Sequence, residues 1–325
     1  MRKFYVVAPG GLTTGGVELA HQLVSSLNEN DLNAYIVYSP FNFDFTIPSS
    51  YKKYNVKVAK ANEIIDDSNS VIVLPEIYTG YAVEFNKASI YIWWMSVDNY
   101  FSIQPQGFVN KIKSTLKRLI KHKNARPKQI PIECLSSYHH LTQSQYAKDF
   151  ISTYGFESDM LSDFLNEEHL NKNVLLEKKE NIVCYNPHKG AQYTQILIEC
   201  LPHYKFVPIK NMSATEVSNL LDLAKIYIDF GNHPGKDRIP REAAMASCVV
   251  ITGLQGSASN EIDIPVDKKY KIDETDIKFV DRVDCLVKEV FTNFTMSHED
   301  FDDYRKKIKN ERQVFDKEVI KIFKN

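Results

Sequence analysis

Short hydrophobic runs alternate with amphipathic stretches along most of the chain. In the first half, four runs bounded by polar or turn-forming residues each predict a buried strand: 4–8, 35–38, 71–74 and 90–95. After the first run, apolar residues recur at helical spacing and predict one helix face: Val17, Ala20, Leu23, Val24 and Leu27. Alternating strands and helices are typical of parallel α/β folds.

A second series of the same kind follows a polar stretch at 166–181, which we interpret as a linker. Its predicted strands are 182–185, 206–207, 226–230 and 248–252, and its predicted helices are 193–201, 214–224 and one from about Pro240. We therefore expect two α/β domains, 1–168 and 169–300. A helix at 301–325 follows, capped by the residues from Ser297 to Asp300.

Composition narrows the function classes. A length of 325 residues suits two domains, and 43% hydrophobic with 25% charged residues is typical of a globular protein. The net charge of -1 argues against whole-surface nucleic-acid binding. Five scattered cysteines and nine histidines offer no zinc-ligand spacing. We see no secretory signal and no membrane-spanning run, and expect a cytoplasmic protein.

The stretch 227–256 contains the most informative chemistry. A buried strand leads into a loop with His233, Lys236, Asp237 and Arg238, and a helix follows with Glu242 in its first turn. Cations beside a helix N-terminus suit a phosphate-bearing ligand, and Glu242 is placed to accept hydrogen bonds from sugar hydroxyls. The alternative is a solvated loop in which the glutamate only complements the helix dipole.

The turn at 9–18 is rich in glycine. A P-loop would need Lys after the last glycine, where Val17 stands, and the glycine spacing does not fit a dinucleotide fingerprint. Gly15 and Gly16 still allow a polar ligand to approach a helix N-terminus closely. A tight strand-to-helix turn without a ligand is the alternative.

These features together resemble a GT-B glycosyltransferase, close to the family 4-like enzymes of bacterial surface-polysaccharide synthesis. The matching segments occur in the family's order: 15–18, 141–146, 186–190, 213–221 and 241–244. The resemblance implies two Rossmann-like domains facing a cleft, with the C-terminal helix packing back on the first. One departure is Pro234, where retaining members commonly have a glutamate. Retention or inversion therefore stays open.

The resemblance also implies transfer of a sugar from a nucleotide-sugar to a glycan or lipid-linked acceptor, without a metal cofactor. Alternatives are a nucleotide-sugar epimerase of the same fold and a non-catalytic GT-B-like binding subunit. The implied donor-binding residues are Gly15, Gly16, Asn186, His188, Lys189, His233, Lys236, Arg238, Glu242, Gly256 and Ser257.

Inversion would require a general base from the first domain. Asp98 and Glu76 are the candidates, because each lies just after a predicted strand. Each is equally well explained as a loop acid. Trp94 and Tyr100 are candidates for stacking on an acceptor sugar, or else pack in the core.

The segment 107–128 has eight Lys/Arg and no acid, with its apolar residues on one helical face. Such a basic amphipathic helix suits an anionic membrane surface, with Lys113, Lys117 and Lys121 as candidate contacts at the inner face of the cell membrane. The alternative is an ordinary helix with a solvated basic face.

Overall fold

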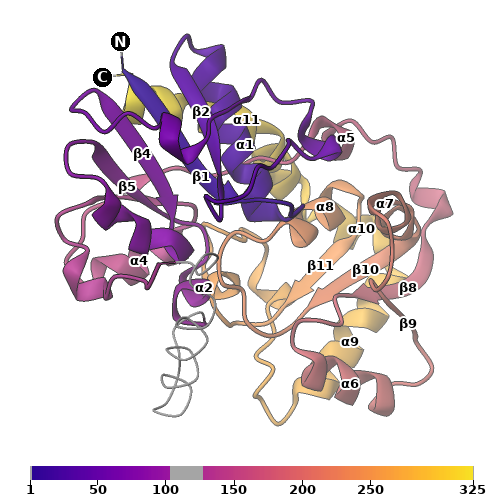
Figure 1. Cartoon of the computed structure of the whole chain (residues 1–325). Coiled ribbons are helices and arrows are strands. Elements are labelled where there is room, and N and C mark those ends of the chain that lie inside the picture. Colours follow the sequence, from indigo (N-terminus) through magenta and orange to yellow (C-terminus); the bar gives the residue numbers. More distant parts are fainter. Residues whose placement is uncertain (1, 103–126, 325) are drawn as a thin grey trace. The chain divides into compact units, whose positions relative to one another are not determined.

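The computed structural model describes residues 2–102 and 127–324. Within it the chain forms two compact units (Figure 1). Unit 1 comprises Met1–Asp163 and Val314–Asn325, and unit 2 is Phe164–Gln313. We expected the first boundary at 168/169, whereas the division lies at 163/164, and the chain re-enters unit 1 at Val314.

Unit 1 is built on a seven-stranded sheet in the order β3-β2-β1-β4-β5-β6-β7, with every neighbouring pair parallel. Its strands are β1 Lys3–Pro9, β2 Asn33–Ser39, β3 Lys57–Val58, β4 Ser70–Pro75, β5 Ser89–Trp94, β6 His139–Thr142 and β7 Asp159–Met160. The four longest strands confirm the four predicted hydrophobic runs. Strands buried on both faces of a parallel sheet are expected to be continuously apolar.

The helices of unit 1 are α1 Gly15–Glu29, α2 Val97–Ser102 and α4 Gln145–Ser152. Helix α1 follows β1 directly and buries its apolar face, including Leu23 and Leu27. Ser144 caps α4 by accepting a hydrogen bond from the Ala147 N–H. These connections place the starts of α1 and α2 after the carboxyl ends of β1 and β5, where ligands of parallel sheets commonly bind.

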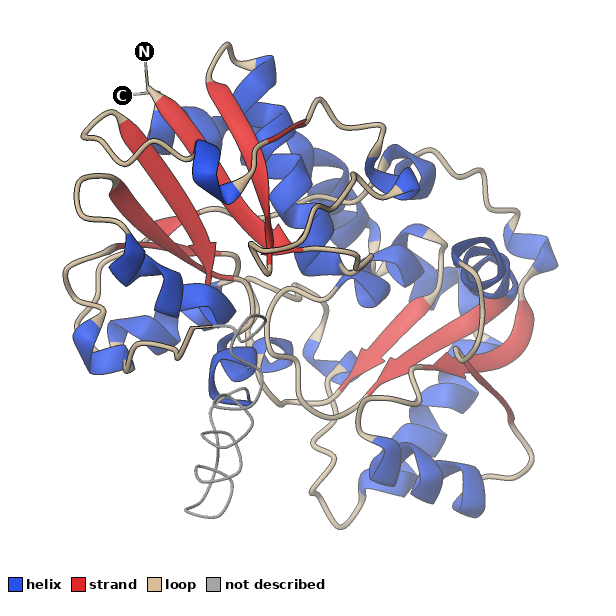
Figure 2. Ribbon diagram, in the orientation of Figure 1, coloured by secondary structure: helices blue, strands red, loops and turns tan. Residues whose placement is uncertain are grey.

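Unit 2 has a second parallel sheet, in the order β11-β10-β8-β9, with helices packed beside the strands (Figure 2). Its strands are β8 Glu180–Tyr185, β9 Lys205–Pro208, β10 Ala224–Asp229 and β11 Val249–Thr252. Its helices are α5 Glu167–Leu170, α6 Ala191–Cys200, α7 Ala214–Leu223, α8 Arg238–Met245, α9 Phe279–Thr292 and α10 Phe294–Glu299. The predicted strand and helix order is confirmed throughout this unit.

The C-terminal helix α11, Asp302–Phe323, starts in unit 2 and ends in unit 1. Its last turns pack on the first sheet, with the Phe323 ring 5.7 Å from the Phe4 ring, which confirms the expected return to the first domain. The predicted cap is wrong, because Ser297 lies inside α10 and α11 begins two residues after Asp300. The pattern could not reveal this break because hydrophobic spacing continues across it.

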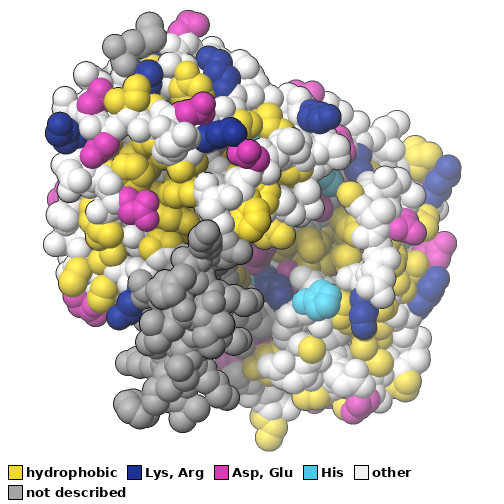
Figure 3. Space-filling model, viewed as in Figure 1, with side chains coloured by type: hydrophobic (Ala, Val, Ile, Leu, Met, Phe, Trp, Pro, Cys, Tyr) yellow, Lys and Arg dark blue, Asp and Glu magenta, His cyan; other side chains and the backbone are white. Residues whose placement is uncertain are grey.

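Lys/Arg and Asp/Glu side chains are interspersed on the visible surface, in keeping with the net charge of -1 (Figure 3). Among the described helices, none combines the length and hydrophobicity needed to cross a bilayer. The predicted membrane contacts Lys113, Lys117 and Lys121 lie outside the described residues.

Candidate functional site

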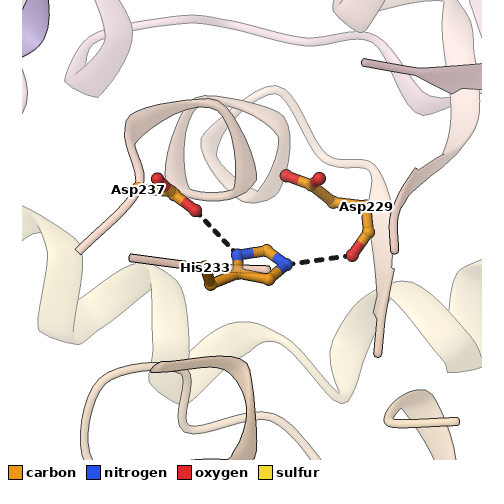
Figure 4. A group of neighbouring side chains, drawn as sticks. All are labelled: Asp229, His233 and Asp237. Carbon is orange, nitrogen blue, oxygen red and sulfur yellow. Dashed lines mark hydrogen bonds and ion pairs between the residues drawn. The ribbon is translucent and has the colours of Figure 1, made fainter. Parts of the chain in front are cut away.

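The clearest cluster of charged side chains in unit 2 surrounds Lys189. Its ammonium Nζ lies 2.5 Å from Asp237 Oδ2, 3.0 Å from His233 Nδ1 and 3.5 Å from Asp229 Oδ2. Asp229 ends β10, and the other two residues lie on the loop before α8. Asp229, His233 and Asp237, here called the Asp–His–Asp group, point toward one another in Figure 4.

His233 is the centre of this group and is fully buried. Its Nε2 lies 3.0 Å from the Asp229 carbonyl oxygen, and its Nδ1 lies 2.7 Å from Asp237 Oδ2. Burial lowers the pKa of His233, but the hydrogen bond to Asp237 and the charge of Asp229 outweigh it and hold the pKa above its usual value. The ring therefore holds the Asp237 carboxylate and the backbone of Asp229 in place.

The two acids differ in environment. Asp229 is buried, and burial raises its pKa, although the charges of His233 and Lys189 oppose this. One carboxylate oxygen accepts from the Tyr227 hydroxyl at 2.9 Å, and the other, Oδ1, has no partner in the described part of the chain. Burial raises the pKa of Asp237, but hydrogen bonds to His233 and Lys189 and their charges lower it by more, so this pKa lies below the usual value.

Three ligand atoms of the Asp–His–Asp group lie within 4.8 Å of one another, close enough to hold a metal ion. Sequence reasoning missed this group. Its signal is the spacing of four residues from Asp229 to His233 and again to Asp237. Because the Lys189 ammonium lies against all three side chains, a fixed positive charge already stands where the group would hold a metal ion.

Two glycines allow Lys189 to reach this position. Gly190 and Gly231 both have positive φ, 51° and 93°. A Cβ on Gly190 would lie 2.2 Å from the Phe230 carbonyl oxygen, and one on Gly231 would lie 2.7 Å from Gly190 Cα. The backbones that follow β8 and β10 thus touch. In the backbone that follows β8, the Asn186 side-chain oxygen accepts a hydrogen bond from the His188 N–H at 3.0 Å. The His188 side chain is exposed.

Gly256 and Ser257 support the loop before α8. The Ser257 N–H donates to the His233 carbonyl at 2.9 Å, and its hydroxyl donates to the Gly235 carbonyl at 2.6 Å. A Cβ on Gly256 would lie 2.1 Å from the same His233 oxygen. Ser257 was expected among the donor-binding residues, and in this structure its N–H is already bonded to a carbonyl.

Helix α8 begins at Arg238, so Glu242 lies in its second turn and not in its first, as we expected. The Glu242 carboxylate Oε1 lies 3.7 Å from Arg238 Nε and 3.6 Å from His169 Nε2 on α5. Our prediction started the helix at Pro240. Because proline is favoured in the first turn of a helix, a helix start inferred from a proline can differ from the true start by one or two residues.

Two further cations, Lys236 and Arg241, form ion pairs with Glu311 on α11. Lys236 Nζ lies 2.9 Å from Glu311 Oε1, and the buried Arg241 donates to Glu311 Oε2 at 2.7 Å. Arg241 also donates to the Asp237 carbonyl at 3.1 Å. This pairing fixes the loop that carries the Asp–His–Asp group. Lys236 and Arg238, expected as open cations, are thus both ion-paired.

Unit 1 offers a second set of predicted residues at the carboxyl ends of its strands. Gly15 and Gly16 are exposed at the start of α1, where no side chain caps the helix. A Cβ on Gly16 would lie 3.6 Å from Met95 Sδ, so this helix start adjoins the end of β5. Its N–H groups remain suited to a negatively charged ligand.

The two candidate bases have different surroundings. Glu76 is buried and accepts the Met95 N–H at 3.0 Å. Burial raises the pKa of Glu76 to about 7, against backbone N–H groups that lower it. Asp98, on α2, is partly exposed. Burial, and to a smaller extent the charge of Asp98, raise the pKa of Tyr146.

Trp94 and Tyr100 both belong to the core of unit 1, so the interpretation as acceptor-stacking residues is wrong for this structure. Both side chains are 0% exposed. The Trp94 Nε1–H donates to His140 Nδ1 at 3.1 Å, and the Tyr100 hydroxyl donates to the Ile130 carbonyl at 2.6 Å. Buried aromatic side chains satisfy their polar ends in this way.

No protein-family model and no curated protein matches the chain. Solved structures match it over nearly its whole length. Sucrose-phosphate synthase from Thermosynechococcus elongatus has a TM-score of 0.67 at 9% identity, covering 100% of this chain and 98% of that one. WaaG, a glycosyltransferase involved in lipopolysaccharide biosynthesis, has a TM-score of 0.61 at 11% identity, covering 99% and 100%.

A third similar structure is the E. coli trehalose-6-phosphate protein bound with UDP-2-fluoro glucose. Its TM-score is 0.59 at 10% identity, and 98% of this chain and 99% of that one are covered. At such low identities the likeness establishes the fold alone. The chain has the GT-B fold that is found in glycosyltransferases, which confirms the fold expected from the resemblance.

Proposed function

We propose that this GT-B protein is a glycosyltransferase that moves a sugar from a nucleotide-sugar donor to a glycan or lipid-linked acceptor. The fold supports this, since similar structures include a lipopolysaccharide glycosyltransferase and a protein bound to a UDP-sugar analogue. Fold alone does not fix chemistry, so the proposal depends on the site.

The observation that carries the proposal is the fixed ammonium of Lys189 at the carboxyl ends of β8 and β10. In glycosyl transfer the leaving diphosphate gains negative charge, and a preorganised cation stabilises it. Lys189 is 17% exposed and is held in position by the Asp–His–Asp group. We propose that a diphosphate oxygen replaces the longest contact of Lys189, the one to Asp229 at 3.5 Å, without a metal ion.

The remaining donor contacts follow from the same geometry. Glu242 is 14% exposed and is proposed to accept hydrogen bonds from ribose hydroxyls, with Arg238 and His169 holding its carboxylate. In unit 1, considered by itself, we propose that the N–H groups at the start of α1, at Gly15 and Gly16, bind a negatively charged group. In unit 1 we propose Asp98 as the general base, because it is partly exposed and Glu76 is buried.

The test is a thermal-shift panel of UDP, GDP, CMP and dTDP, each measured with and without EDTA. Because a ligand that binds only the folded state stabilises it by mass action, one nucleotide is expected to raise the Tm equally in both conditions. Lys189→Met should remove this shift, and Lys210→Met, an exposed lysine of unit 2, should keep it. Stabilisation that depends strictly on a divalent metal contradicts the metal-free proposal.

Release of sugar from the preferred nucleotide-sugar then separates a transferase from a non-catalytic binding subunit. Under the proposal, wild-type protein releases nucleotide from its donor, and release increases when acceptor is added. Asp98→Asn should lower turnover with little change in donor binding. Glu76→Gln should retain turnover. Loss of turnover in the second variant alone would transfer the base role to Glu76.

A further inference from the structure

A separate cavity of about 480 Å³ lies in unit 1 at the amino ends of β6 and β7. The unit 1 residues of the site proposed above, Gly16 and Asp98, lie instead beyond the carboxyl ends of β1 and β5. A volume of this size is within the range of roughly 300–1,000 Å³ typical of small-ligand pockets. The lining residues are Tyr91, Ser136, Tyr138, His139, His140, Gly155, Phe156, Glu157, Ser158 and Asp159.

The walls combine aromatic rings with hydrogen-bonding groups. Tyr91 stacks on His139 at 4.5 Å, and Phe156 stacks on His140 at 4.5 Å, so ring planes are held rigidly along two sides. Tyr138 is partly exposed and adds a third ring with a hydroxyl. Rigid aromatic faces present a large contact area with little loss of conformational entropy on binding.

Six polar side chains of the lining have no hydrogen-bond or ion-pair partner within residues 2–102 and 127–324: Tyr91, Ser136, Tyr138, His139, Glu157 and Ser158. They supply both donors and acceptors around one cavity. By contrast, Asp159 is paired with Lys321 at 2.8 Å, and His140 is bonded to Trp94 and to the Leu135 carbonyl. Glu157 is therefore the one lining carboxylate without a described cation.

This chemistry selects among ligand classes. A phosphate would need an unpaired cation, and none of the described residues that line the cavity is a lysine or an arginine. A divalent metal would need several close ligands, and in the described residues the group that offers them is Asp229, His233 and Asp237 in unit 2. A purely apolar ligand would leave the hydroxyls and the carboxylate desolvated without partners.

We propose that this cavity binds one pyranose unit of a neutral saccharide. The C–H face of a sugar ring is attracted to the negative face of an aromatic ring, and Tyr138 offers such a face. Sugar hydroxyls donate to the Glu157 carboxylate and exchange hydrogen bonds with Ser136 and His139. A role for this cavity in holding an acceptor glycan away from the transfer site rests on the proposed function, whereas saccharide binding by the cavity does not.

The test is binding of maltotetraose, cellotetraose and chitotetraose to the full chain, measured by calorimetry and ligand-observed NMR with saturating UDP present. At least one oligosaccharide is expected to bind. Glu157→Gln should weaken binding about tenfold, because a hydrogen bond to a charged group is worth about that much. Tyr138→Ala should weaken binding by up to about tenfold, because the aromatic face is lost. Phe43→Ala and Glu133→Gln, an exposed ring and an exposed acid elsewhere in unit 1, should bind like wild type.

Three results would overturn the assignment: no oligosaccharide binds, binding is unaffected in both cavity variants, or tetramethylammonium binds in place of sugar. The last would make the cavity an organic-cation site. The UDP-induced Tm shift of each variant is recorded in parallel. Cavity variants that lose sugar and keep nucleotide stabilisation support the inference, whereas failure of UDP, GDP, CMP and dTDP all to stabilise wild type counts against the proposed function alone.

Discussion

Replacing Glu76 with Gln should change the stability of unit 1 in opposite directions at low and high pH. Glu76 is 2% exposed, and burial raises its pKa to about 7 from the ordinary value of 4.5. Between these values the folded chain binds more protons than the unfolded chain. Linkage then requires the free energy of unfolding to fall as pH rises through this interval and to level off above it.

The magnitude follows from the two pKa values of Glu76. At about 1.4 kcal/mol for each pH unit between them, ionisation of the buried carboxyl costs about 3 kcal/mol of stability at pH 8.5. Gln avoids this cost because it stays neutral. Its amide N–H₂ also faces backbone donors where a carboxylate oxygen stood, which costs about 1 kcal/mol at every pH. Glu76→Gln should therefore be more stable by about 2 kcal/mol at pH 8.5 and less stable by about 1 kcal/mol at pH 4, which lies below both pKa values.

The assay is urea unfolding at pH 4.0 and 8.5, followed by tryptophan fluorescence. Both tryptophans of the chain, Trp93 and Trp94, lie on β5 beside Met95, so the signal reports on unit 1. Other titrating groups are common to both proteins and cancel in the difference between them. Glu133→Gln is the matched control, because this acid is exposed. An equal stability difference between Glu76→Gln and wild type at both pH values refutes the reasoning.

Three other changes test unit 2. Lys189→Ala should remove the built-in cation and let the Asp–His–Asp group bind Zn²⁺, which equilibrium dialysis would detect as one ion per chain; zinc uptake no greater than that of wild type contradicts this. Glu242→Gln should weaken nucleotide binding about tenfold with an unchanged Tm, and unaltered affinity would exclude the ribose contact. Lys179 is buried and donates to the carbonyls of Leu221, Ala224 and Ala246, so Lys179→Met should destabilise unit 2 by about 3 kcal/mol in urea unfolding. The exposed neighbour variant Lys178→Met should not, and equal effects of the two would refute the anchoring role.

The regular elements were predictable because parallel strands are buried on both faces. Such strands form continuous apolar runs, as at 71–74 and 248–252, and the structure places strands at both. Strands β3 and β7 contain two residues each, Lys57–Val58 and Asp159–Met160, and are too short to produce a pattern. Edge strands are commonly this short, so sequence periodicity finds the centre of a sheet better than its edges.

The site was predictable one residue at a time and not as a constellation. Lys189 and His233 were both predicted as donor-binding residues, but their contact joins positions 44 residues apart. Nothing in the local pattern indicates that contact, which depends on the pairing of β8 with β10. Asp229 was not recognised as a site residue because it is the polar last residue of a hydrophobic strand. The burial of Glu76 and Trp94 could not be predicted from the sequence either. A residue at the end of an apolar run, or just past it, can face either the core or solvent.

The pairing of every predicted cation with an acid changes how the donor site would select its ligand. Lys189 contacts Asp237, Lys236 contacts Glu311 and Arg238 contacts Glu242. Open cations on one loop would repel each other and attract any anion, whereas paired cations have little net field at a distance. A ligand must then compete with carboxylates already in contact. A diphosphate carries enough charge on several oxygens to do so, and a single monovalent anion does not. The acids around these cations would thus contribute specificity for the donor rather than affinity.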